Sequence, residues 1–132
     1  MDLEILKIAS KNNNNRYIQN YTHMSKLKNH LCGDEMLISL IIKNNKIIDF
    51  GYQGKSCIYC QAAASLLSKI SINNEKSKIN ELCDDAKLFF DGNDEMIKKK
   101  WSLMQKLFKS KHKARKECIL LPFNTVKKIV SV

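Results

Sequence analysis

The sequence predicts an α+β domain in which a small antiparallel β-sheet of about three strands packs against several helices. Two observations carry this prediction. Residues 35–54 show a period of two with one apolar face, which is typical of strands, and much of the later chain carries apolar residues three or four positions apart, which is typical of helices. The chain has 132 residues and no long linker, so we expect one domain over residues 1–132.

The clearest predicted element is a hairpin. One strand is expected over residues 35–43 and the next over 46–54, and Asn44-Asn45 between them suits a tight turn because Asn tolerates positive φ. A weaker pattern predicts a further strand near residues 24–29. The side chains expected to face the core are Met36, Ile38, Leu40 and Ile42 in the first strand and Ile48, Phe50 and Tyr52 in the second.

Helices are predicted on both sides of the hairpin. Residues 2–11 are expected to form a short helix capped by Asp2, a further helix is expected after Cys57, and Pro122 suits the first turn of the last helix. The expected inward residues are Leu3, Leu6 and Ile8; Ala62, Ala63, Leu66, Leu67 and Ile70; Ile79, Leu82, Cys83, Ala86 and Phe90; Ile97, Trp101, Met104 and Phe108; and Phe123, Val126, Ile129 and Val130.

The net charge of +10 is high for this length. It suits either an acidic partner or a Lys- and Asn-rich proteome whose solvated faces use Lys, and we favour the second interpretation. Nine basic and no acidic residues lie between 98 and 116, on a segment whose inner side is expected to hold Trp101 and Phe108. These aromatic residues fit an apolar stripe rather than a base-stacking platform, so no nucleic-acid partner is expected.

The compartment is inferred from what the chain lacks. Its start is acidic without a long apolar run, and no stretch approaches the roughly 18 apolar residues of a membrane span, so we expect a cytoplasmic protein without a membrane partner. Thiols stay reduced in that compartment. Five Cys, an odd number, therefore indicate metal ligands or reactive thiols rather than a disulfide framework.

Three of these Cys and one Asp lie near the predicted ends of elements. Cys32-Gly33-Asp34 precedes the first clear strand, Cys57 lies where a strand gives way to a helix, and Cys118 shortly precedes the last helix. Gly33 lets the backbone turn so that its two neighbours converge, and a helix N-terminus favours a thiolate. Three thiolates and a carboxylate suit a four-coordinate zinc or iron–sulfur site. The spacing alone leaves open that these Cys are small core residues.

The remaining Cys and His give weaker signals. Cys57-Ile58-Tyr59-Cys60 has redox-dithiol spacing, but a hairpin precedes it rather than the first strand of a βαβ unit, so Cys60 is interpreted as a core residue or an accessory thiol. Cys83 lies on an apolar helical stripe and is expected to be structural. His30 is expected at the surface, and His23 and His112 have no evident partners.

Three segments together resemble a known family. Leu31-Cys32-Gly33-Asp34, then Gly54-Lys55-Ser56-Cys57 before an Ala- and Ser-rich stretch, and finally the segment from Ala114 to Phe123 are similar to the three signature regions of the NifU N-terminal family, the SufU/IscU type. The likeness extends from about residue 17 onward, with the motifs in order. The long stretch between the second and third motifs resembles SufU more than IscU. The Leu-Pro-Pro-Val-Lys motif of IscU is absent, so a dedicated Hsp70 partner is not expected.

The resemblance implies a SufU/IscU-like domain that acts as a scaffold in iron–sulfur cluster assembly. It implies that Cys32, Asp34, Cys57 and Cys118 bind zinc, iron or a nascent [2Fe-2S] or [4Fe-4S] cluster. The implied partners are a cysteine desulfurase, which donates sulfur, and downstream acceptor or carrier proteins. The alternative is a zinc-dependent sulfur relay with sulfurtransferase-like activity, in which Cys118 accepts persulfide sulfur and Arg115 is an assisting cation.

Overall fold

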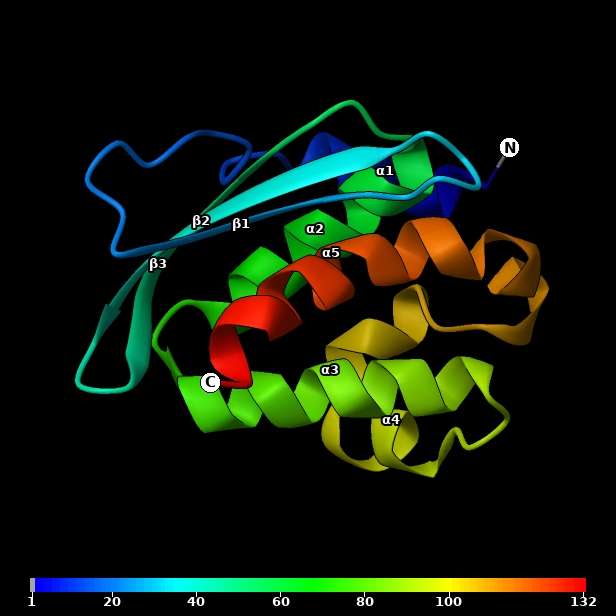
Figure 1. The fold of residues 1–132 in the computed structure, drawn as a ribbon. Helices are drawn as coiled ribbons and strands as arrows, with labels where there is room; N and C mark the ends of the chain where they lie inside the picture. The colour runs from blue at the N-terminus through cyan, green and yellow to red at the C-terminus, as the bar shows by residue number, and fades with distance from the viewer. Residues whose placement is uncertain (1) are drawn as a thin grey trace.

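The computed structural model describes residues 2–132, so Met1, where the predicted single domain begins, lies outside the described residues. The helices are α1 (Leu3–Ser10), α2 (Ile58–Ser71), α3 (Lys76–Phe90), α4 (Glu95–Lys100) and α5 (Lys116–Val130), with two 3₁₀ helices, η1 (Ser102–Lys106) and η2 (Ser110–Arg115). The strands are β1 (His23–Lys28), β2 (Glu35–Lys43), β3 (Lys46–Gln53) and β4 (Asn74–Glu75). The predicted α+β class is confirmed (Figure 1).

The strands form one antiparallel sheet of four strands in the order β1-β2-β3-β4. Helices α2 and α5 pack against one face of this sheet, α1 packs on α2, and α3 packs on α5 (Figure 1). The apolar side chains of the predicted hairpin fill this helix-covered face, with Met36, Ile38, Leu40, Phe50 and Tyr52 at most 1% exposed. The sheet and its helical layer therefore enclose the core that the alternation predicted.

The hairpin is confirmed, with one correction in its second strand. Asn44 and Asn45 have φ of 53° and 63°, as the tight turn requires. A bulge shifts the register so that Ile42 pairs with Ile47 while Ile41 pairs with Asp49. The bulge turns Ile47 into the core and leaves Ile48 half-buried, so the predicted inward position of Ile48 is wrong.

Helix α1 begins after Asp2, whose side chain accepts hydrogen bonds from the first-turn amides, as predicted. Of the residues predicted to face inward, Ile8 is buried but Leu3 and Leu6 are not. Leu3 and Leu6 are 76% and 42% exposed, whereas Ile5 and Ile8 are buried on the side that meets α2. Leu3 and Leu6 are three residues apart, and so are Ile5 and Ile8. In so short a helix, periodicity alone could not decide which pair faces the core.

The predicted stripe from Ile97 to Phe108 is not one helix. Helix α4 ends at Lys100, and its C-cap Trp101 has φ of −125° and ψ of 60°, outside the helical region; η1 and η2 follow. The Trp101 indole Nε1–H donates to Asp85 Oδ2 of α3 at 2.8 Å, which holds the ring at the end of α4. Met104, in η1, and Phe108, between η1 and η2, are nevertheless buried in the core.

The last helix begins earlier than predicted. Pro122 lies in the interior of α5, and Cys118 lies in the first turn of that helix rather than before it. Pro122 has no N–H to offer the Cys118 carbonyl four residues earlier. Phe123, Val126, Ile129 and Val130 are buried, as predicted. Within residues 2–132, no helix is both long enough and apolar enough to cross a membrane.

Candidate metal centre

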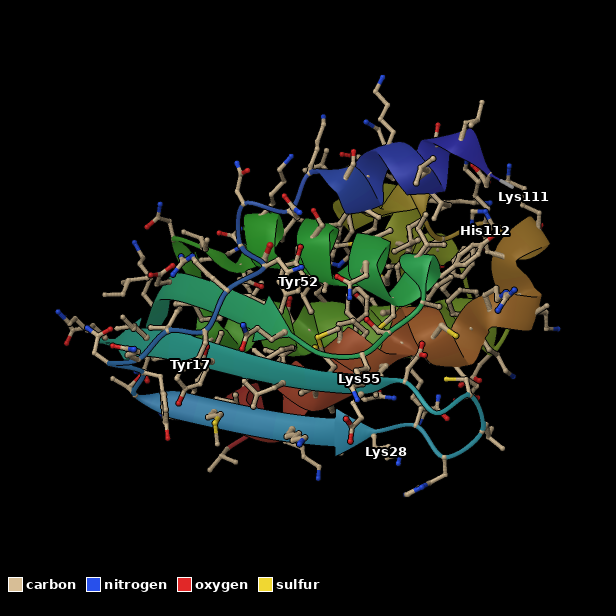
Figure 2. The ribbon with its side chains drawn as sticks, turned by 90° about the horizontal axis from the view of Figure 1, so that it is seen from above. Tyr17, Lys28, Tyr52, Lys55, Lys111 and His112 are labelled. Carbon is tan, nitrogen blue, oxygen red and sulfur yellow. The ribbon has the colours of Figure 1, made fainter. Side chains whose placement is uncertain are left out.

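The segments that carry the predicted ligands meet at one end of the sheet. The β1–β2 loop, the start of α2 and the start of α5 come together there (Figure 1). In Figure 2, Lys28 at the end of β1 and Lys55 before α2 mark this end of the sheet. The site therefore draws on one loop and two helix N-termini; the sequence predicted the places of Cys32, Asp34 and Cys57, and placed Cys118 before the last helix rather than in its first turn.

The β1–β2 loop, residues 29–34, is shaped by its backbone. Gly33 has φ of 77°, a left-handed conformation that suits glycine, and its N–H donates to the Asn29 carbonyl at 2.8 Å. The Asn29 N–H donates to the Asp34 carbonyl, also at 2.8 Å. This tight loop turns the chain between Cys32, which is exposed, and Asp34, which is 8% exposed. The side chains of Cys32 and Asp34 can then point toward the same position.

Two helix N-termini form the other side of the site. Cys57 is the N-cap residue of α2, and its backbone N–H donates to Asp34 Oδ2 at 3.2 Å. That hydrogen bond joins the β1–β2 loop to the start of α2. Cys118, in the first turn of α5, is only 4% exposed. Both helix starts direct backbone N–H groups and the positive end of the helix dipole toward this part of the molecule.

Three of the four predicted ligands converge closely. The Sγ atoms of Cys32 and Cys118 and a carboxylate oxygen of Asp34 all lie within 4.8 Å of one another. Cys57 lies outside that set, although its thiol adjoins that of Cys118. A change of the Cys57 side-chain rotamer would move its Sγ without moving the helix. Sulfur and carboxylate donors suit tetrahedral zinc, and thiolates suit iron–sulfur clusters, so the donor set fits either group.

The thiols of the site differ in their electrostatic surroundings. Burial, reinforced by the adjacent Cys57 and Cys32 thiols, raises the pKa of Cys118 above its ordinary value. Burial also raises the pKa of Cys60, which is fully buried just inside α2. Cys83 is buried on α3, where burial raises its pKa to about 12, in agreement with its predicted structural role. Because the raised pKa of Cys118 favours its protonated thiol, binding of a metal at Cys118 would release a proton.

Arg115 does not act as an isolated charge. It is exposed at the end of η2, and its guanidinium carbon lies 5.4 Å from the centre of the Tyr59 ring. The same ring meets His112 edge-on, with centroids 5.4 Å apart. A cavity of about 200 Å³ opens beside this stack, bounded by Asp2, Ile5, Ile58, Tyr59 and Arg115. The stack orients Arg115 beside the start of α5.

His112, for which no partner is evident from the sequence, is paired in the structure. This side chain is 3% exposed, with Nε2 3.0 Å from Asp2 Oδ2 and Nδ1 2.8 Å from the Leu107 carbonyl (Figure 2). The pairing spans 110 positions, and no local pattern marks it. His23 is likewise paired, with Nδ1 2.8 Å from Thr22 Oγ1, whereas His30 is exposed, as expected.

Comparison with known proteins points to one family. Residues 4–86, which include Cys32, Asp34 and Cys57, match the family described as NifU-like N terminal domain. The iron–sulfur cluster assembly scaffold protein IscU of Thermotoga maritima is 30% identical over 102 residues, which cover 76% of this chain and 70% of that protein. An uncharacterized protein of Borreliella burgdorferi is 30% identical over 132 residues, covering 94% of this chain and 84% of its own.

Solved structures share the fold. One, from Fervidobacterium islandicum and described as an iron–sulfur cluster assembly scaffold for the SUF system, superposes with a TM-score of 0.87 at 21% identity, covering 97% of this chain and 94% of that one. A NifU-like N-terminal protein of Brucella abortus gives a TM-score of 0.80 at 18% identity, covering 98% and 91%. The predicted SufU/IscU-like arrangement of helices and sheet is thereby confirmed.

Proposed function

This chain belongs to the NifU-like N-terminal domain family, and from that premise we propose that it is a scaffold for iron–sulfur cluster assembly. Cys32, Asp34, Cys57 and Cys118 hold the metal or the nascent cluster, and a cysteine desulfurase supplies the sulfur. One observation carries the proposal. The donor atoms of Cys32, Asp34 and Cys118 converge within 4.8 Å from a loop and a helix that are far apart in the sequence.

The donor set suits a cluster that is cargo rather than a permanent cofactor. Thiolates bind iron–sulfur clusters firmly, whereas the Asp34 carboxylate is a harder donor and a weaker ligand for them. Cys32 is exposed at the loop tip, so part of the coordination sphere faces solvent and an incoming acceptor protein. A weak ligand beside an accessible thiolate favours transfer of the cluster to a downstream protein.

The decisive test is analysis of iron, zinc and acid-labile sulfide in protein purified without oxygen, followed by cluster reconstitution with a desulfurase and cysteine. We expect iron and sulfide to bind together in the parent and to be lost in Cys32→Ser and Cys118→Ser. Cys83→Ala, at a buried thiol on α3, is the matched control and should reconstitute like the parent. A parent that holds neither metal nor sulfide under these conditions would refute the scaffold.

A zinc-dependent sulfur relay is the alternative, and the exposure of one thiol favours it. In this reaction an acceptor thiolate attacks the outer sulfur of the desulfurase persulfide, so the sulfane sulfur moves to the acceptor and the donor Cys leaves as its thiolate. The sequence predicts Cys118 as acceptor with Arg115 assisting. Cys32 is exposed while Cys118 is 4% exposed, so an incoming persulfide meets Cys32 first.

The two reactions and the two acceptors are separable in one experiment. Zinc-loaded protein is incubated with a desulfurase and cysteine, and persulfides are alkylated and mapped by mass spectrometry. A relay gives a labelled persulfide and faster desulfurase turnover without iron, whereas a scaffold gives a visible cluster spectrum only when iron is present. Sulfur on Cys32 alone would refute Cys118 as the acceptor, and sulfur on neither would refute the relay.

A further inference from the structure

We infer that Asn29 is the positioning residue that fixes the distance between the β1–β2 loop and α5, and thereby between Cys32 and Cys118. This inference rests on the proposed metal site for its functional meaning. It concerns a residue that is not itself a ligand and that lies at the first position after β1. Its side chain is half-buried between the loop and the first turn of α5.

All four polar groups of Asn29 are used. Its backbone N–H and carbonyl pair with Asp34 and Gly33, each at 2.8 Å, and close the loop. Its side-chain Oδ1 accepts the Leu31 N–H at 2.9 Å, which makes an Asx turn at the approach to Cys32. Its Nδ2 donates to the Glu117 carbonyl at 3.3 Å, directly before Cys118 in the chain.

The side-chain amide is suited to this double role. Because Oδ1 is fixed by the Leu31 N–H, Nδ2 must point to the other side, where the Glu117 carbonyl lies. The Asn side chain carries an acceptor and a donor on one planar amide, and Gln, which carries the same amide, is one carbon longer. Asp retains the acceptor but would set a carboxylate against the Glu117 carbonyl. The Asx turn and the tie to α5 can therefore be separated by substitution.

The hydrogen bond from Asn29 to the Glu117 carbonyl matters because the two thiols that it aligns, Cys32 and Cys118, come from different elements. Cys32 lies on an exposed loop, whereas Cys118 is held by the buried face of α5. A metal site requires its donors in one fixed arrangement, and residues that orient ligands from outside the coordination sphere commonly contribute about 10- to 100-fold in metal affinity. Asn29 joins the exposed side of the site to the buried side through a side chain and a helix carbonyl.

The first test needs no metal. In a Cys57→Ser background, diamide oxidises the Cys32 and Cys118 thiols to a disulfide and is itself reduced to the hydrazine, and the closure rate reports how often the two Sγ atoms meet. We expect Asn29→Ala and Asn29→Asp each to slow closure by about fivefold or more. The control is Asn93→Ala, which removes a comparable side-chain acceptor at the turn before α4 and should close like the parent.

The second test uses cobalt as a probe in the chain with Cys57 intact. The thiolate-to-cobalt absorption band reports binding, and we expect Asn29→Ala and Asn29→Asp to lower the affinity by about tenfold. Parent-like closure rates and affinities in Asn29→Asp would overturn the role of the tie to Glu117, and parent-like values in both variants would overturn the inference altogether. If the parent binds no cobalt while the closure rates follow the expected order, Asn29 keeps its positioning role and the proposed metal site fails.

Discussion

The two sides of the candidate centre differ in what holds them in place. On the loop side, Cys32 and Asp34 are held by backbone hydrogen bonds around Gly33 and Asn29, and Cys32 is exposed. On the helix side, Cys57 and Cys118 begin helices α2 and α5, whose inner faces fill the core. One side of the same site is shaped by a short loop, and the other is shaped by tertiary packing.

This difference separates site geometry from global stability. Burial of apolar side chains supplies most of the favourable free energy of folding, so substitutions beneath the helix side lower stability and disturb the site together. Surface substitutions on the loop side bury little area and change stability by about 0.5 kcal/mol or less. The loop side is therefore where metal binding can be altered while the fold is kept.

The largest expected effect lies beneath the helix side. Phe123 is 1% exposed on α5 and packs edge-on against Phe108, with centroids 5.5 Å apart. Phe123→Ala should lower the free energy of unfolding by about 3–5 kcal/mol, measured by urea denaturation. Leu31→Ala is the counterpart on the loop side. Leu31 lies next to Cys32 and is 83% exposed, so its replacement should change the free energy of unfolding by about 0.5 kcal/mol or less. Equal losses in the two variants would remove the distinction between the sides.

The next effect concerns Gly54, where the end of β3 passes the start of β2. A Cβ at Gly54 would lie 2.0 Å from the Glu35 carbonyl oxygen, a backbone atom that cannot swing away. Gly54→Ala should lower the free energy of unfolding by about 2–3 kcal/mol. Gly33→Ala is the control on the loop side, because a Cβ at Gly33 would meet no atom within 4 Å. Only the left-handed φ disfavours Ala there, so the free energy of unfolding should fall by about 1 kcal/mol. A larger loss at Gly33 would mean that the loop is more constrained than its contacts indicate.

Local patterns predicted the part of the fold that surrounds the site. The bounds of β2, the Asn44-Asn45 turn and the buried stripe of α3 all follow from spacings within a few residues. The convergence of Cys32, Asp34 and Cys118 was expected from motif order and the family resemblance, and the structure brings them together. Sequence reasoning worked where a short-range period or a known motif carried the signal.

The failures have a common physical cause. The two-residue strand β4 is too short to show a period, and the interior position of Pro122 depends on tertiary packing that outweighs a missing hydrogen bond. The His112–Asp2 and Asn29–Glu117 contacts join residues 110 and 88 positions apart. Such contacts depend on how the elements pack, which the pattern of a single sequence does not reveal.

A smaller effect on stability, but a clear one on metal binding, is expected at Asp34. If its carboxylate is a ligand, Asp34→Ala should weaken zinc binding by about tenfold or more while the fold survives, and a bound cluster should exchange more slowly without the labile carboxylate. Asp34→Asn keeps an oxygen to accept the Cys57 N–H but loses the charge. Competition titration with a zinc chelator measures the zinc affinity, and a cluster-transfer assay measures the rate at which a bound cluster leaves the protein. If both variants bind zinc and transfer the cluster as the parent does, Asp34 is not a ligand and the site consists of Cys residues alone.

The smallest expected effect lies away from the metal, where Asp2 joins α1 to η2. Hydrogen bonds from His112, and then from Lys111, hold the pKa of the Asp2 carboxyl well below its ordinary value of 3.8. The unfolded carboxyl protonates near 3.8 while the folded one stays ionised, so this stabilisation is complete above that pH and is lost as the pH falls toward the folded pKa. Asp2→Asn keeps a helix cap but removes the charge, so its melting temperature should lie roughly 2 °C below the parent at pH 6, and this gap should narrow as the pH falls below about 4 toward the folded pKa. Asp94→Asn, which loses only an exposed pair with Lys98, should give a smaller gap, and a gap for Asp2→Asn that does not change with pH would show that the carboxylate charge contributes nothing.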